Sequence, residues 1–171
     1  MVRRMSRKLG SNATLSVVAI FFALAGQVFA QDVTPPADVI ISDVGTVDAP
    51  VSNEIPNAFR GLEVFIDRKL GNCVACHTNF DVAAMQFLGE IGPNLDWIGD
   101  RLTEGELRAI LVDPKAVFGS HTVMPAFYTA RPGNRTLESF QGKTILTAIQ
   151  IEDVVAYLSS LSQETGFDGV D

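Results

Sequence analysis

The chain has 171 residues, 47% of them hydrophobic, and its 20 acidic and 13 basic residues give a formal charge of −7. Residues 1–30 contain four of the basic residues and no acidic one, so the nine basic and twenty acidic residues that follow give the rest of the chain a charge of −11. An acidic chain without Lys/Arg clusters does not bind nucleic acid through its phosphates, which excludes that class of partner.

Residues 1–30 have the pattern of a secretory signal peptide. A basic start, RRMSRK, is followed by an apolar run over 13–25 that is too short to span a bilayer, and then by the small residues Val28 and Ala30. We expect cleavage near Ala30 and a mature protein that works outside the cytoplasm, without a membrane span. The alternative is an uncleaved membrane anchor.

Residues 31–56 differ in composition from the rest of the chain. They contain four prolines and repeated acidic residues, without the apolar period of a helix. We expect an extended, Pro-rich acidic arm that is attached to a surface of the domain through Val39, Ile40 and Ile41. The alternative is disorder of the whole segment.

The first predicted helix lies within 57–71. Asn57 is a favourable N-cap residue, apolar side chains recur at helical spacing after it, and Gly71 is typical of a helix end. The apolar positions are Ala58, Leu62, Phe65 and Ile66. This helix therefore has one apolar face that needs a partner.

Two further helices are predicted from capping boxes, in which a Thr side chain and a Glu or Gln side chain three residues later bind each other's backbone amides. The first lies in TEGELRAILVDP, from Thr103 to Pro114, where the proline stops it. The second lies in TAIQIEDVVAYLSSL, from Thr147 to Leu161, and has an apolar stripe along one face.

Gly- and Pro-rich segments without the alternation of strands connect these helices. The domain, 57–171, is therefore expected to be all-α, with a few short helices joined by long loops. Loops of that length inside a small domain need something other than side chains to fill the interior. A large apolar cofactor would do so.

The segment CVACH, Cys73 to His77, holds both cysteines of the chain and one of its two histidines. A thioredoxin-like dithiol requires a mixed sheet that the pattern does not contain. A zinc site would use Cys73, Cys76, His77 and His121, but adjacent ligands suit a tetrahedral site poorly. Cys-x-x-Cys-His is instead the attachment signature of haem c, in which both thiols become thioethers and the histidine binds iron. We therefore predict one covalently bound haem c.

The sixth ligand of the haem iron must come from the face opposite His77. Met124 is the preferred residue because it lies in the loop TVMPAF, where Pro125 stiffens the backbone. Met85 follows His77 too closely to round the haem edge with any slack, and His121 is the runner-up. Methionine more often fills gaps in a core than it binds iron, so the preference for Met124 depends on the haem motif.

Three further residues are candidates for the haem pocket. Pro93, in the segment GEIGPNLDWIG, is placed to pack beside the proximal imidazole. Trp97 is expected in the haem pocket or the core. Arg101 is a candidate partner for a haem propionate, with an ordinary surface role as the alternative.

Together these segments resemble class I cytochromes c, which the order helix, CVACH, GPNL, MPAF and last amphipathic helix indicates. Gly61 and Phe65 with Val154 and Tyr157 are similar to the family's contact where the terminal helices cross. More closely, GNCVACH, GEIGPNL, RLTEGELRAILVDPKAVF, TVMPAFY and GKTILTAIQIEDVVAYLSSL are similar to the SoxX family, the monohaem subunits of the SoxAX (SoxXA) cytochrome complex. The resemblance covers about 57–161.

The resemblance implies a periplasmic heterodimer with a SoxA-like haem subunit. That complex acts as an L-cysteine S-thiosulfotransferase, which joins thiosulfate oxidatively to a cysteine of a SoxYZ-like carrier protein and passes electrons to a downstream cytochrome. Thioether bonds at Cys73 and Cys76 and iron bonds at His77 and Met124 leave this chain no thiol and no open iron site. Its part is therefore electron transfer, with the sulfur chemistry on the partner, and a Met ligand raises the reduction potential relative to a second His.

Two other classes of function remain open from the residues alone. One is a free diffusible periplasmic class I cytochrome c electron carrier, against which the arm at 31–56 counts because a minimal carrier does not need it. The other is a redox or zinc thiol protein, which the visible spectrum of the purified chain would distinguish at once from a haem protein.

Overall fold

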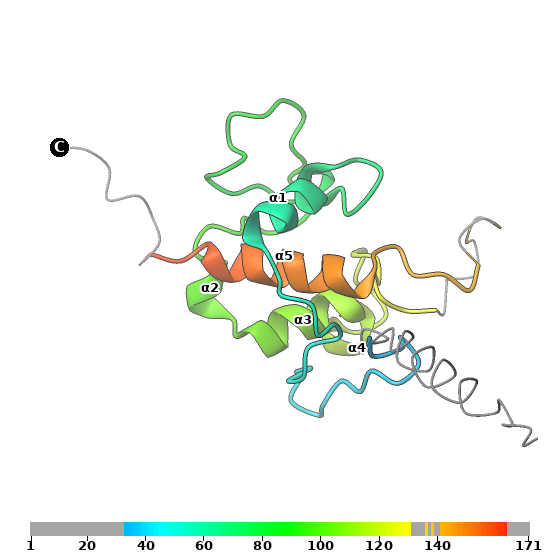
Figure 1. Ribbon diagram of the computed structural model, residues 1–171. Coiled ribbons are helices and arrows are strands. Elements are labelled where there is room, and N and C mark those ends of the chain that lie inside the picture. The colour runs from blue at the N-terminus through cyan, green and yellow to red at the C-terminus, as the bar shows by residue number, and fades with distance from the viewer. Residues whose placement is uncertain (1–32, 131–135, 137, 139–140, 164–171) are drawn as a thin grey trace, which may run out of the picture. The chain divides into compact units, whose positions relative to one another are not determined.

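The computed structural model describes residues 33–130, 136, 138 and 141–163. Within them, five α-helices and one 3₁₀ helix are joined by long loops, and the only strand-type pairing is an isolated bridge between Val33 and Ser52. The elements are α1 (Ala58–Ile66), η1 (Cys73–Ala75), α2 (Ile98–Arg101), α3 (Glu104–Val112), α4 (Pro114–Phe118) and α5 (Ala148–Ser160) (Figure 1). The prediction of an all-α domain with a few short helices is confirmed.

The predicted signal peptide, 1–30, lies outside the described residues. In the part of the chain that is described, no helix has the length and apolar character needed to cross a membrane. Residues 31 and 32, at the predicted start of the mature chain, also lie outside the described part, so the structure bears on the domain and on most of the arm.

Each of the three predicted helices begins after the N-cap residue expected from the sequence. Asn57 caps α1, and Thr103 and Thr147 form complete capping boxes at α3 and α5. Pro114 does more than stop α3, because it is also the first residue of α4. Its fixed φ and missing N–H suit that position, and Asp113 caps the new helix by accepting a backbone amide of the first turn at 3.0 Å.

Helix α5 is central, with α1 packed across it and α3 beside it (Figure 1). Helices α1 and α5 approach closely at Gly61, where a Cβ would overlap the carbonyl oxygen of Asp153. Next to this contact the rings of Phe65 and Tyr157 meet edge to face, with centroids 5.4 Å apart. Arg60 completes the contact by donating from Nε to the Asp153 carboxylate at 2.8 Å. The crossing of the terminal helices therefore forms where the sequence resemblance placed it.

Residues 33–56 have no regular secondary structure, but they are folded onto the domain rather than disordered. The expectation that Val39, Ile40 and Ile41 attach the arm is confirmed for Val39 and Ile41, which are partly buried and pack against the core, and is wrong for Ile40. Ile40 is 82% exposed, and the buried anchors are Val47 and Val51. The reason is geometric: in an extended segment successive side chains point to opposite faces, so three consecutive apolar residues cannot all face the domain.

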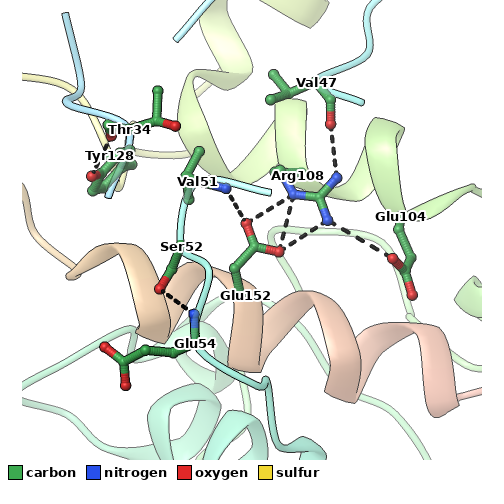
Figure 2. A network of polar contacts seen from close by, with 9 residues as sticks. All are labelled: Thr34, Val47, Val51, Ser52, Glu54, Glu104, Arg108, Tyr128 and Glu152. Atoms are coloured by element: carbon green, nitrogen blue, oxygen red, sulfur yellow. Dashed lines mark hydrogen bonds and ion pairs between the residues drawn. The ribbon is translucent and has the colours of Figure 1, made fainter. Parts of the chain in front are cut away.

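A buried ion pair between α3 and α5 holds the arm (Figure 2). Arg108 Nε donates to Glu152 Oε1 at 2.9 Å, and each of the two side chains is only 3% exposed. The arm binds both partners, because Arg108 Nη1 donates to the Val47 carbonyl at 2.7 Å and the Val51 amide donates to Glu152 Oε1 at 2.8 Å. The arm is therefore a structural part of the domain.

We expect Arg108→Met to lower the free energy of unfolding by about 3 kcal/mol or more, because it leaves the Glu152 carboxylate buried without a cation. Denaturant unfolding of the haem-loaded protein measures this loss. The matched control is Arg68→Met, at an exposed position, which is expected to change stability by less than about 0.5 kcal/mol. Equal losses in the two variants would contradict the assigned role of the ion pair.

Candidate functional site

A cavity of about 540 Å³ lies between α1, α3, α5 and the loops that connect them. This volume is within the roughly 300–1,000 Å³ that is typical of cofactor and small-molecule sites. The walls are predominantly apolar. The helical side chains that line the cavity are Phe65 of α1, Ile98 of α2, Leu107, Ile110 and Leu111 of α3, Phe118 of α4, and Val154 and Leu158 of α5. A large apolar ligand would therefore complete the core.

A single 3₁₀ turn, η1, brings Cys73, Cys76 and His77 to the cavity. The main-chain amides of Cys76 and His77 donate to the Cys73 carbonyl at 3.0 Å and 2.9 Å, which closes the turn. All three residues line the cavity. Two sulfur atoms and one imidazole thus lie beside the same apolar volume, as covalent haem attachment and iron ligation require.

The geometry argues against a redox dithiol. No disulfide joins Cys73 and Cys76. Burial raises the pKa of the Cys73 thiol to about 12, so this residue carries almost no thiolate at neutral pH. A reactive dithiol needs the thiolate, which usually lies in an electropositive and partly exposed setting.

The geometry argues equally against a zinc site. Among the described residues, no cluster of three or more His, Cys, Asp or Glu side chains could hold a metal ion. His121, the fourth ligand of the zinc hypothesis, is exposed and does not line the cavity that contains Cys73, Cys76 and His77.

The His77 ring is held in one orientation by the loop that contains Pro93. Its Nδ1 lies 2.8 Å from the Pro93 carbonyl oxygen, which can only accept a hydrogen bond, so Nδ1 carries the proton. The other ring nitrogen, Nε2, therefore keeps a lone pair for a metal ion. Gly92 packs against the same ring, and a Cβ at Gly92 would overlap the ring atoms.

Of the three residues considered for the second axial position, Met124 is the one that lines the cavity. It is partly buried and packs against the core. Met85 is 42% exposed, His121 is exposed, and neither lines the cavity. The cavity thus receives an imidazole from the turn after η1 and a thioether from the loop after α4.

Trp97 and Arg101 do not line the cavity, although the sequence made them candidates for the pocket. Trp97 is 45% exposed and packs on the ring of Phe80, with centroids 6.1 Å apart. The next residue, Ile98, takes the lining position because it is the buried residue of α2. Arg101 donates from Nη2 to two carbonyls of the loop before α2, both at 3.2 Å, so it holds this loop in shape.

The contributions of α3 and of two glycines to the site were not predicted from the sequence. The apolar period of 103–114 predicts a buried face but not that Leu107 and Leu111 face the cavity. Gly89 lies so close to the Ala75 carbonyl oxygen that a Cβ would overlap it, and Gly92 lies against the histidine ring. The sequence pattern that could have indicated this role is the pair of glycines shortly before Pro93. Such a pattern is typical of a loop that closely approaches other backbone.

Comparisons with known proteins agree with this geometry. The cytochrome c family model matches residues 58–162. The crystal structure of SoxXA from P. pantotrophus contains a chain that is 39% identical, with a TM-score of 0.69, and the match covers 76% of this chain and 98% of that chain. No curated protein sequence matches the chain. The comparisons and the cavity chemistry together identify the site as that of a covalently bound haem c.

Gly92→Ala is expected to reduce the covalent haem content severalfold, because the added Cβ takes space that the His77 ring occupies. The measurement is haem per protein that survives acid–acetone extraction, identified by the pyridine spectrum of haem c. Gly105→Ala in α3 is the control, since the nearest atom to its Cβ is an oxygen of the exposed Asp48 carboxylate at 3.1 Å. Full haem content in Gly92→Ala would rule out this role of the glycine.

Proposed function

This chain belongs to the cytochrome c family and is a SoxX-like monohaem cytochrome, and we propose that it is the electron-transfer subunit of a periplasmic SoxXA-type complex. The observation that carries the proposal is the donor set of the cavity, in which Cys73, Cys76, His77 and Met124 surround one apolar volume. Each of these four side chains would have a role in holding the haem, the two cysteines as thioethers and the other two as axial ligands. When bound, the haem supplies a one-electron couple of its iron.

In this proposal His77 and Met124 are the two axial ligands of the iron. The assignment of His77 as a ligand is supported by its tautomer, because the hydrogen bond from Nδ1 to the Pro93 carbonyl leaves the lone pair of Nε2 for the iron. Met124 is supported by its place in the cavity wall and by the absence of both Met85 and His121 from that wall. If both residues bind the iron, it would have no open site for thiosulfate, and the chain holds no further cysteine.

The division of labour between the subunits follows from these occupied groups. Joining thiosulfate to a cysteine thiolate of a SoxYZ-like carrier forms one S–S bond and releases two electrons, and no atom leaves. This chain offers no thiol for the bond, so the bond forms on or beside the SoxA-like haem subunit. Its own residues would hold a haem through His77 and Met124 among apolar side chains, and the bound haem would supply the one-electron couple that accepts those electrons for a downstream cytochrome.

A partner subunit and an exported location complete the proposal. The P. pantotrophus structure is that of SoxXA, and the match spans 98% of the corresponding chain there, so nearly all of that chain has a counterpart here. The signal-like segment 1–30 favours the periplasm. After its removal the charge of −11 favours association with a positively charged surface.

A free electron carrier is the second candidate function, and the structure of the arm removes the argument made against it. The arm was an argument against a free carrier because a minimal carrier does not need an extra segment. That argument holds only if the arm has no role within the domain. Residues 33–56 bury Val47 and Val51 and bind the Arg108–Glu152 pair, so the arm has such a role. The two candidates are therefore distinguished by assembly, and the arm does not decide between them.

Met124→Ala is expected to abolish the weak near-infrared band that a methionine–ferric haem bond gives, and to lower the reduction potential, because water or a nitrogen ligand replaces the thioether. Absorption spectroscopy and redox titration of the purified haem protein measure the two effects. Met85→Ala and His121→Ala are the matched controls, since both residues lie off the cavity wall. A band that survives Met124→Ala but is lost in Met85→Ala would reassign the ligand.

The isolated chain is expected to accept electrons but not to couple thiosulfate to a thiol. Coupling should appear only when a SoxA-like haem subunit and a SoxYZ-like carrier are both added. Mass spectrometry of the carrier, which gains the mass of one thiosulfate group, measures the reaction directly. The native protein should co-purify with its haem partner through an interface of about 2,000 Å² or more.

Two outcomes would contradict the complex. Thiosulfate coupling by the isolated chain would refute the division of labour between subunits. Purification from the periplasm as a monomer that reduces or oxidises other cytochromes would favour the free carrier instead. The haem spectrum is the same in either case, so neither outcome bears on the assignment of the axial ligands.

A further inference from the structure

Lys115 in α4 contacts the main chain of the proposed axial methionine. Its Nζ donates to the Met124 carbonyl oxygen at 3.0 Å. Within the described part of the chain, this is the only hydrogen bond recorded for the main chain of Met124. The next residue, Pro125, has no N–H to offer. The segment that carries the thioether therefore depends on a side chain for its attachment.

Backbone hydrogen bonds hold the loop around Met124 on both sides, but not at Met124 itself. On the N-terminal side the Thr122 amide donates to the Gly119 carbonyl at 3.3 Å. On the C-terminal side the Phe127 amide donates to the Leu111 carbonyl at 3.0 Å. Between these two points the backbone has no regular structure, so the Lys115 bond is what restrains its centre.

Lys115 is itself held by a short, well-capped turn. Its amide donates to Asp113 Oδ1 at 3.0 Å, and its carbonyl accepts the Gly119 amide at 3.0 Å. The preceding residue, Pro114, is buried and starts α4 with a fixed φ. The lysine side chain thus extends from backbone that is fixed on both sides, which allows its ammonium group to define the position of the carbonyl it binds.

We propose that Lys115 is a positioning residue for the Met124 thioether, which it holds toward the haem iron through the Met124 carbonyl. The inference rests on the proposed ligation by Met124. The ammonium group acts in two ways, because it restrains the loop and also places a positive charge near the ligand, which favours the ferrous iron. Lys115 is exposed, so solvent screens both effects and the expected changes are modest.

The test is a titration of the oxidised haem protein with imidazole, which competes with the thioether for the iron. Lys115→Met keeps the aliphatic stem but removes the donor and the charge, and it should tighten the apparent imidazole affinity about three- to tenfold. Lys115→Arg keeps a charged donor and should restore most of the difference. Lys143→Met removes the same charge at another exposed position and should leave the affinity unchanged.

Each result of this titration decides the question. An unchanged affinity in Lys115→Met, or an equal change in Lys143→Met, would overturn the positioning role. A lower melting temperature of Lys115→Met with wild-type imidazole affinity would mean that the lysine only stabilises the fold, which also overturns it. If Met124→Ala keeps the near-infrared band, the ligand assignment itself fails and this inference fails with it. Failure of the thiosulfate assay would leave the titration result unaffected.

Discussion

Two adjacent carboxylates near the middle of α5 join this helix to α1 and α3 through ion pairs. Glu152 and Asp153 are 3% and 2% exposed, and an isolated buried carboxylate is costly enough that each must have a cation. Arg108 of α3 binds the first, and Arg60 of α1 binds the second. Since neighbouring positions on a helix point in different directions, the two ion pairs bring α3 and α1 to different sides of α5.

That arrangement leaves the haem cavity between the helices. Phe65 of α1, Leu111 of α3 and Val154 of α5 all face it, so each of the three helices contributes to the cavity wall. A protein with helices this short and loops this long does not bury enough of its own apolar surface at its centre. The covalently bound haem supplies the missing apolar volume and thus belongs to the core as well as to the function.

The cavity also reaches the surface, as electron transfer requires. Ile91, Phe118 and Val123 line it and are 73%, 60% and 77% exposed. These three side chains form an apolar edge of the cavity. Other contacts hold the side chains of the site in place. The Pro93 carbonyl fixes the tautomer of His77, and Gly92 leaves room for its ring. The loop that carries the Met124 thioether is bound at its centre by Lys115.

The sequence by itself determined the cofactor, the proximal ligand candidate and three helices, because these depend on local chemistry. The haem attachment motif with Cys73 and Cys76 and the capping boxes each involve only a few neighbouring residues. Patterns of that length can be recognised directly in the sequence. Only the tertiary structure decided that the arm is anchored by Val51 rather than Ile40, that Arg108 pairs with Glu152, and that Trp97 and Arg101 lie off the cavity wall. These outcomes depend on groups far apart in the chain, whose meeting is set by the packing of α1 and α3 on α5 and leaves no local pattern.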